Sequence, residues 1–317
     1  MTDATNNNSN LRWAPPAMNN PTVIDLNTTG NKTYWQFSPN QDVIFLGANK
    51  VDTNTRLQTD GGHNIMVLGG DFQPTGHAVG TLYFGNLTGE AWVDGVHINN
   101  VNAGQRDGID INGAPGSHPN LVVQNSIIEN ISGAQSGVHG DMVQTQGPTG
   151  DLDFYNVTGT TNYQGLFIAP QHDTGSATLE NVNLRYTGPT DAGSNSSYLL
   201  WTLDDSTEKP YPISFNNVYV EPRAGTAAEE STVWPKHSLS DIGNTVQGNQ
   251  ISWPSLPYSG HVTVGAPPGG DFVNPANIGT NFPAAAHSLA DLTSHVLPSD
   301  AAATDAATTQ AAWHSGG

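Results

Sequence analysis

The chain has 317 residues, of which only 12 % are charged and 35 are Gly. Cysteine is absent, which excludes disulfides, zinc–thiolate sites and a thiol nucleophile. The formal net charge is −19, and such a surface repels nucleic acid and anionic lipid because phosphate binding needs Lys and Arg. The sequence contains no run of about 18 apolar residues, so no membrane span is predicted. We therefore expect neither nucleic acid nor a membrane among the partners of this chain.

The N-terminal segment, residues 1–40, is rich in Asn and carries aromatic residues such as Trp13 and Trp35. It has neither the basic start nor the apolar core of a secretory signal, so no signal peptide is recognised. If the following region is a stack of repeats, its open end must be covered. We therefore predict that residues 1–40 form an N-terminal cap.

A short pattern recurs along residues 41–265. Each copy ends in Gly or Asn, and the residue two positions earlier is apolar. Gly and Asn accept the left-handed backbone conformation more easily than other residues. A repeated Gly or Asn between apolar residues therefore indicates a sharp bend between two strands, and stacked Asn side chains can bond to one another. The copies are FLG 45–47, LGG 68–70, VDG 93–95, VQN 123–125, FYN 154–156, LEN 179–181 and FNN 215–217.

The bend pattern predicts an all-β, single-stranded, right-handed parallel β-helix, which is a solenoid of stacked coils. The irregular spacing of the bends places the extra residues of each coil in loops. The alternative is an ordinary β-sandwich with glycines in its turns, but a sandwich does not need one type of corner repeated in register.

A second strand follows a variable loop in each coil. The segment DGIDING, 107–113, aligns with DMVQTQG, 141–147, and a third copy is GLFI, 165–168. Because strand side chains alternate between faces, Ile109 and Val143 are expected to point inward, whereas Asp110 and Gln144 point outward.

These two sets of strands resemble the pectate-lyase-like right-handed parallel β-helix superfamily, and the resemblance covers roughly residues 41–265. In that superfamily a left-handed Asn separates two strands, and the outer face of a third strand carries the active site. The resemblance implies the fold and a carbohydrate-related role. Its members include lyases, hydrolases, epimerases, phage tailspikes and adhesins.

The C-terminal segment, 266–317, is rich in Pro, Gly and Ala. We predict that it forms an extended strap along the stack followed by a flexible tail, with a short helix over Ser288–Val296. Residues 261–275 are similar to stretches in bacterial β-helix proteins that are exported with calcium-binding repeats. The repeats themselves do not occur here, so calcium is not implied and no cofactor is predicted.

A dense polar cluster falls on the second-strand face. Asp107 and Asp141 occupy equivalent places on neighbouring coils about 4.8 Å apart, with Asp110 on the first coil and His139 in the loop before Asp141. Close carboxylates repel, which raises one pKa and creates an acid/base pair of the kind used in glycoside hydrolysis. We predict these four residues to be catalytic, with Asp107 and Asp141 as the acid/base pair. The alternative is a purely structural polar ladder.

The cluster also resembles two groups of β-helix proteins. Pectin-type glycoside hydrolases place three Asp on neighbouring coils near a Gly-His-Gly turn, and Val138-His139-Gly140 lies near Asp141. The spacing of His139, Asp141 and Gln144 is also seen in many uncharacterised bacterial β-helix proteins. The Arg-x-Lys element of the hydrolases has no counterpart here.

Polar and aromatic residues flank this cluster. Exposed aromatic rings in line along a groove form platforms for the apolar faces of sugar rings, unless they pack beneath the long loops instead. Amide and basic side chains nearby are suited to sugar hydroxyls. We predict substrate binding by Tyr83, Arg106, Asn112, Gln144, Gln146, Phe167, Gln171, His172 and Trp201.

We therefore expect a secreted, extracellular carbohydrate-active enzyme that cleaves a polysaccharide or oligosaccharide in a groove, as a glycoside hydrolase or a polysaccharide lyase. A non-catalytic glycan-binding or adhesive solenoid is the first alternative. A uronate epimerase is the second, and it would need a Tyr/His pair such as Tyr163 with His172 near the acids. The oligomeric state stays open, with a trimer among the alternatives.

Overall fold

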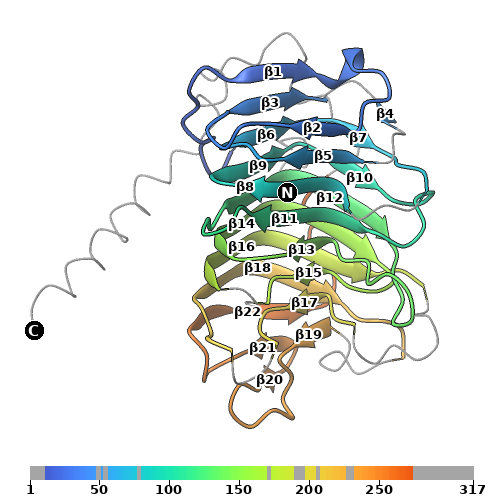
Figure 1. The fold of residues 1–317 in the computed structure, drawn as a ribbon. Coiled ribbons are helices and arrows are strands. Elements are labelled where there is room, and N and C mark those ends of the chain that lie inside the picture. Colours follow the sequence, from blue (N-terminus) through green and yellow to red (C-terminus); the bar gives the residue numbers. More distant parts are fainter. Residues whose placement is uncertain are drawn as a thin grey trace, which may run out of the picture.

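The computed structural model describes residues 11–47, 51–52, 56–76, 80–169, 173–188, 197–204, 208–225 and 232–273. Apart from one 3₁₀ turn, η1 (Leu26–Thr28), the regular elements assigned in these ranges are β-strands, which confirms the predicted all-β class. The strands lie one above another along a single axis (Figure 1). The predicted helix at Ser288–Val296 lies outside the described residues.

The larger sheet has 14 strands, and most of its neighbours run parallel. Three of its strands, β4 (Val51–Asp52), β7 (Asp71–Phe72) and β10 (His97–Asn99), pair off the main path. The others follow the order β1 (Thr22–Asp25), β3 (Val43–Leu46), β6 (Ile65–Leu68), β9 (Glu90–Asp94), β12 (Asn120–Ile131), β14 (Thr149–Thr161), β16 (Thr174–Tyr186), β18 (Ile213–Glu221), β22 (Tyr258–Val264), β21 (Gln250–Ser252) and β20 (Thr245–Gln247).

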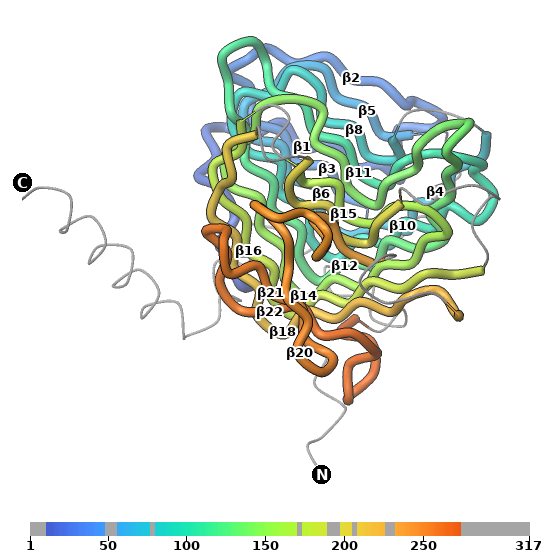
Figure 2. Tube along the Cα trace, turned by 90° about the horizontal axis from the view of Figure 1, so that it is seen from below, coloured from blue at the N-terminus to red at the C-terminus, as the bar shows by residue number. Residues whose placement is uncertain are grey.

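The smaller sheet has 8 strands, all paired in parallel. Along most of the chain, strands of the smaller sheet alternate in sequence with strands of the larger sheet. Each time the chain returns to a sheet, it adds one strand beside the previous one. In the view along the stack, successive turns of the chain lie over one another (Figure 2). The order is β2 (Tyr34–Gln36), β5 (Leu57–Asp60), β8 (Gly80–Leu87), β11 (Asp107–Gly113), β13 (Val143–Thr145), β15 (Leu166–Phe167), β17 (Leu200–Trp201) and β19 (Val233–Trp234).

The hydrophobic core lies between the two sheets. Val123, Phe154 and Leu179 occupy one registered column of the larger sheet and belong to the same buried cluster as Ile109 and Val143 of the smaller sheet. Burying a side chain of this size contributes about 1.5–3 kcal/mol relative to leaving it exposed. Repetition of these contacts in each layer therefore stabilises the stack and keeps the outward face of the smaller sheet in a constant register.

The predicted column of bends is present. Asn125, Asn156, Asn181 and Asn217 all have positive φ. Their side-chain amides form a ladder, with Nδ2 of Asn156 donating to Oδ1 of Asn125 at 3.1 Å and Nδ2 of Asn181 donating to Oδ1 of Asn156 at 3.0 Å. The ladder begins at Asp94, whose Oδ1 accepts from Asn125 at 2.8 Å.

One coil differs from the predicted alignment by a single residue. The registered core residue is Val67 rather than Leu68, because Val67 pairs with Phe45 and with Val93. Gly69, with φ 63°, therefore occupies the bend that was assigned to Gly70. Both glycines have positive φ, so the sequence offered two candidates, and only strand pairing distinguishes them. Leu68 belongs to a second apolar cluster, separate from the main core.

The two ends of the described chain lie against the larger sheet. Residues of the N-terminal segment, including Leu11 and Trp13, pack against the second cluster on its strands. Strands β1 and β2, which pair with the next strands of the two sheets, already lie within residues 1–40, the segment that was predicted to form the cap. Near the other end, Val273 N–H donates to Thr158 Oγ1 at 3.3 Å, so the start of the 266–317 segment runs back along the strands. Within the described part of the chain, no helix is long and apolar enough to cross a membrane.

Candidate active site

The outward face of the smaller sheet changes from polar to aromatic along one registered column. Asp110 of β11 pairs with Gln144 of β13, as predicted, and Gln144 pairs with Phe167 of β15. Phe167 pairs with Trp201 of β17, which in turn pairs with Trp234 of β19. Parallel in-register pairing therefore places carboxyl, amide and aromatic side chains in one line across the strands, at the spacing of a β-sheet.

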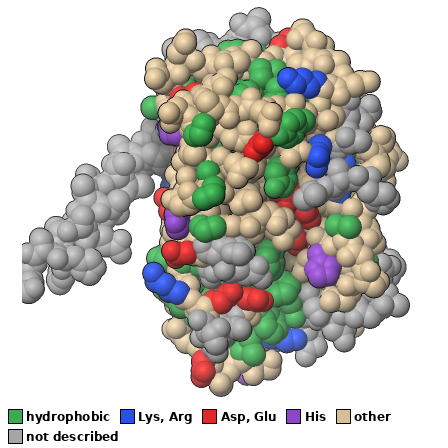
Figure 3. All heavy atoms as spheres, in the orientation of Figure 1, with side chains coloured by type: hydrophobic (Ala, Val, Ile, Leu, Met, Phe, Trp, Pro, Cys, Tyr) green, Lys and Arg blue, Asp and Glu red, His purple; other side chains and the backbone are tan. Residues whose placement is uncertain are grey.

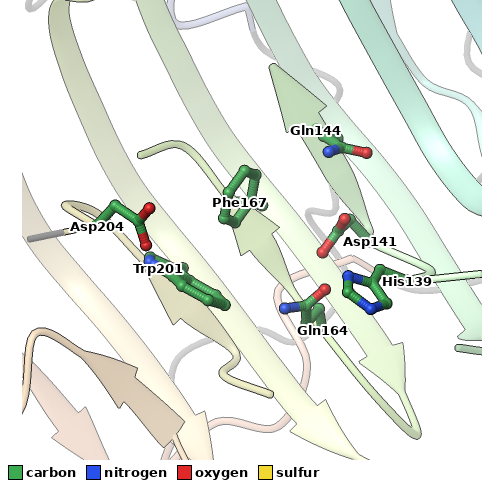
Figure 4. Close-up of a pocket in the computed structure, with 7 residues that line it drawn as sticks. All are labelled: His139, Asp141, Gln144, Gln164, Phe167, Trp201 and Asp204. Atoms are coloured by element: carbon green, nitrogen blue, oxygen red, sulfur yellow. The ribbon is translucent and has the colours of Figure 1, made fainter. Parts of the chain in front are cut away.

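A pocket of about 190 Å³ lies where this line turns from polar to aromatic. Figure 4 shows the carboxylate of Asp141 turned toward His139 and Gln164, with the rings of Phe167 and Trp201 between Asp141 and Asp204. The lining residues come from β13, β15, β17 and the loops beside them, and they are His139, Asp141, Gln144, Gln164, Phe167, Trp201 and Asp204.

Asp141 is the most strongly perturbed acid of the pocket. It lies just before β13, is only 1 % exposed, and its backbone N–H donates to Oδ1 of Asp107 at 2.7 Å. Burial raises the pKa of Asp141 well above its usual value, and the nearby charges of Asp107 and Asp110 raise it further. Its Oδ1 has no hydrogen-bond partner within the described structure. Burial therefore favours the protonated form of Asp141 at the pocket floor.

Asp107 and Asp110 lie on the neighbouring strand β11 and do not line the pocket. Both are buried, and burial raises the pKa of Asp107 to about 6 and that of Asp110 well above its usual value. Oδ1 of Asp110 accepts from Nε2 of Gln146 at 3.0 Å, and the same Nε2 donates to Oε1 of Gln144 at 2.9 Å. The predicted proximity of Asp107 and Asp141 is found, but Asp107 lies on the neighbouring strand β11 and is not among the residues that line this pocket.

Arg106, Asn112 and Tyr83 were predicted to bind substrate, and none of them lines this pocket. Arg106 is 0 % exposed and its guanidinium donates to the carbonyls of Gly76 and Gly80, each at 3.5 Å. Burial, together with the charge of Arg56, lowers the pKa of Arg106 to about 10. The sequence pattern placed Arg106 near the acids correctly but could not show that its side chain is buried.

His139 stands at the exposed rim of the pocket. Its ring lies 5.6 Å from the ring of Tyr163, measured between centroids, and its Nε2 is 3.4 Å from the carbonyl of Gln135. The hydroxyl of Tyr163 donates to the Oε1 of the same Gln135 at 3.0 Å. The residue beside Tyr163 is therefore His139, whereas the pair suggested by the sequence used His172, which lies outside the described residues together with Gln171.

An aromatic row continues from the pocket toward the C-terminal end of the sheet. The ring centroids of Phe167 and Trp201 are 5.0 Å apart, and those of Trp201 and Trp234 are 6.3 Å apart. Tyr198 packs edge-on against Trp201 at 5.2 Å. In the space-filling view, hydrophobic side chains gather on the lower part of this face (Figure 3). Nε1 of Trp201 has no hydrogen-bond partner within the described structure, so an indole donor is left unpaired beside the pocket.

Three residues of this site were missing from the sequence prediction. Gln164 lies two residues before Leu166, just as Asp141 lies two residues before Val143, and Leu166 pairs with Val143. Asp204 and Trp234 were not among the predicted site residues. The pairing of Trp201 on β17 with Trp234 on β19 places Trp234 in the row, and 33 positions separate the two residues in the sequence.

No metal site is evident in the described part of the chain, where no three His, Asp or Glu side chains are grouped to hold an ion. Comparisons with models of protein families, with curated proteins and with solved structures returned no match for this chain. The functional argument therefore rests on the geometry and chemistry of the pocket.

Proposed function

We propose that this protein is a glycoside hydrolase that cleaves a polysaccharide or oligosaccharide on the outer face of a right-handed parallel β-helix. The observation that carries the proposal is the placement of Asp141. A buried carboxyl group with a raised pKa lies on the floor of a pocket whose walls are aromatic and amide side chains. This combination of an acid with a sugar-sized apolar platform is what glycosidic bond cleavage requires.

The strand order supports the β-helix. The chain visits two parallel sheets in turn and advances by one strand at each visit. Connections between parallel strands are right-handed in nearly all proteins, because a right-twisted strand continues most easily in that sense. The Asn ladder at the bend is also typical of such a stack. The resemblance to the pectate-lyase-like superfamily adds to the same interpretation.

Cleavage in this pocket needs two carboxyl groups. Asp141, kept protonated by burial, transfers its proton to the glycosidic oxygen as the bond to the anomeric carbon breaks. Asp204 lies across the pocket beyond Phe167 and Trp201 (Figure 4), where it takes a proton from the water whose oxygen bonds to that carbon. The products are two shorter chains, one with a new reducing end, and proton exchange with solvent restores both carboxyl groups. This role for Asp204 replaces the one expected for Asp107.

The amides position the sugar. Gln144 and Gln164 line opposite sides of Asp141 and offer both donors and acceptors to hydroxyl groups. Gln146 fixes Gln144 by donating to its Oε1, so the Gln144 side chain is held for recognition through a second residue. A polymeric substrate of this kind is consistent with a protein that acts outside the cell.

Two alternatives make different demands. A polysaccharide lyase or a uronate epimerase acts on an acidic sugar, and Tyr163 with His139 supplies the Tyr/His pair that an epimerase needs. Tyr163 is buried, however, and it is absent from the residues that line the pocket. A non-catalytic glycan-binding protein would use the same aromatic row but would not need the acid.

The test is hydrolysis of a panel of neutral and acidic polysaccharides by the wild type, Asp141→Asn and Asp204→Asn, with Asp241→Asn as an exposed control distant in sequence. We expect new reducing ends with wild type and control, and a loss of about 100-fold or more in both pocket variants. Unsaturated products, detected by ultraviolet absorbance, would identify a lyase instead. Glycan binding by wild type and Asp141→Asn without any cleavage would favour the non-catalytic alternative.

A further inference from the structure

We infer that the glycan bound in this pocket is uncharged, and that it runs across the strands along the row Phe167–Trp201–Trp234. This inference rests on the proposed function, because it names the class of substrate for the same site. It selects a neutral polysaccharide over the uronic-acid polymers that a lyase or an epimerase would require. The argument comes from the charges around the pocket and from the direction of the aromatic row.

The described lining of the pocket contains two carboxyl groups and no Lys or Arg, and His139 at the rim is its one basic side chain. Asp141 and Asp204 line it, and none of the described lining residues is Lys or Arg. The segments 170–172 and 205–207, which follow Ala169 and Asp204 in the sequence, read PQH and DST and also lack Lys and Arg. Recognition of a sugar carboxylate normally relies on the charged hydrogen bonds of Arg or Lys. A uronate ring would find no Lys or Arg partner among the described lining residues, and it would lie near the carboxyl group of Asp204.

Three basic side chains do not reach the described lining of the pocket. Arg106 is buried beneath the acids and donates to backbone carbonyls. Arg223 lies 3.6 Å over the ring of Tyr186 and donates to the carbonyl of Asn162 at 2.8 Å. Lys236 lies 5.5 Å over the ring of Trp234, at the far end of the row. The net charge of −19 adds a long-range repulsion toward any polyanion.

The aromatic row gives the direction of the glycan. Phe167, Trp201 and Trp234 come from three adjacent parallel strands and occupy the same registered position on each. A chain lying over all three rings must therefore run across the strands, parallel to the axis of the stack. Gln144 continues the same line on the polar side, where it meets the next sugar unit.

The test compares a neutral polymer that the enzyme cleaves with the same polymer oxidised at its primary hydroxyls to carboxylates. The two chains share linkage and length and differ only in charge. We expect binding and cleavage of the oxidised form to be at least tenfold weaker at low salt, and the difference to shrink as salt screens the carboxylates. Trp201→Ala should weaken binding of the neutral chain at least tenfold, whereas Tyr34→Ala, which alters a side chain that is 40 % exposed on β2, should not.

A charge insertion separates this inference from the proposed function. Gln144→Lys adds a cation beside the pocket floor and should shift binding preference toward the oxidised chain, measured by isothermal calorimetry so that no turnover is needed. Equal or tighter binding of the oxidised chain by the wild type would overturn the inference while leaving hydrolysis intact. If neutral chains bind but none is cleaved, the proposed function fails and the inference stands. Unchanged binding in Trp201→Ala, with a native circular dichroism spectrum, would overturn the predicted path.

Discussion

Asn125 donates its side-chain amide to Oδ1 of Asp94 at 2.8 Å, and this buried pair is where the Asn ladder begins. The other carboxyl oxygen of Asp94 has no hydrogen-bond partner within the described structure. An acid in this position is stabilised in its protonated form, because burying an unpaired charge is costly. The start of the ladder is therefore sensitive to pH, whereas its later steps join neutral amides.

Replacing Asp94 by Asn should remove this sensitivity. Burial raises the pKa of Asp94 from 3.8 to about 7, although the bond from Asn125 opposes the shift. The carboxyl group therefore stabilises the folded state fully below about pH 4, and this contribution is lost as pH rises toward 7. Asp94→Asn should be more stable than wild type at pH 8, by up to about 4 kcal/mol, with the advantage shrinking toward pH 4. Urea unfolding at several pH values measures this, and parallel stability curves for the two proteins would contradict it.

The middle of the ladder can be probed at Asn156. Asn156→Ala removes two amide hydrogen bonds and puts Ala, which tolerates the left-handed conformation less well than Asn, at φ 49°; together these changes should cost about 2–4 kcal/mol. Asn156→Gly removes the same bonds but accepts the backbone conformation, so it should cost about 1 kcal/mol less. Equilibrium unfolding of both variants separates the two contributions. Equal losses would mean that the left-handed conformation carries no cost at this bend.

His97 should make stability depend on pH in a different window. Its Nδ1 lies 3.0 Å from Asp71 and its Nε2 lies 2.9 Å from Glu129, and its side chain is 14 % exposed. Burial opposes the charge, yet the bond to Glu129 and the charges of both acids raise the pKa of His97 above 6.5. The stabilisation is therefore present below pH 6.5 and is lost as pH rises through the raised value.

The variant that tests the contacts of His97 with the two acids is His97→Gln. We expect it to be less stable than wild type by roughly 1–2 kcal/mol at pH 5.5 and by much less at pH 9, as measured by thermal or urea unfolding. His118→Gln changes an exposed histidine and serves as the control, with no effect expected at either pH. A loss of the same size at both pH values would indicate that His97 acts through packing alone.

One glutamine of the larger sheet makes three hydrogen bonds to the N-terminal segment. Oε1 of Gln124 accepts from the backbone N–H of Arg12 at 2.6 Å and from that of Trp13 at 3.0 Å, and its Nε2 donates to the carbonyl of Trp13 at 3.0 Å. Gln124→Ala should destabilise the protein by about 1–3 kcal/mol, because these buried contacts are lost without replacement.

The same variant should also release the segment locally. Limited proteolysis should cleave Gln124→Ala near Trp13 faster than wild type, because the segment would then be held by fewer contacts, among them the packing of Leu11 and the ion pair of Arg12 with Glu180. Gln58→Ala, which changes a side chain on the smaller sheet, is the matched control. Unchanged cleavage with reduced global stability would show that Gln124 supports the sheet itself and not the N-terminal segment.

Much of the fold was predictable because its signals are local. The Gly or Asn at each bend and the alternating residues of 107–113 and 141–147 follow from backbone sterics and from the two-residue period of a strand. The register of Asp110 with Gln144 was therefore correct, as was the ladder of Asn125, Asn156 and Asn181. The error at Gly70 arose where two consecutive glycines satisfied the same local rule.

Composition, the alternation of apolar and polar residues, and Gly or Asn at the bends are local features of the sequence. The sequence alone therefore determined the all-β class, the bend column and the presence of acids on one face. Which acid reaches the pocket was decided only by tertiary structure. Asp107, Asp110 and Arg106 carry the same polar signal as Asp141, but they lie on or beside β11, one strand away from the residues that line the pocket, and only strand pairing sets that position. Asp204 and Trp234 joined the site for the same reason, because strand pairing brings together residues that long loops separate in sequence.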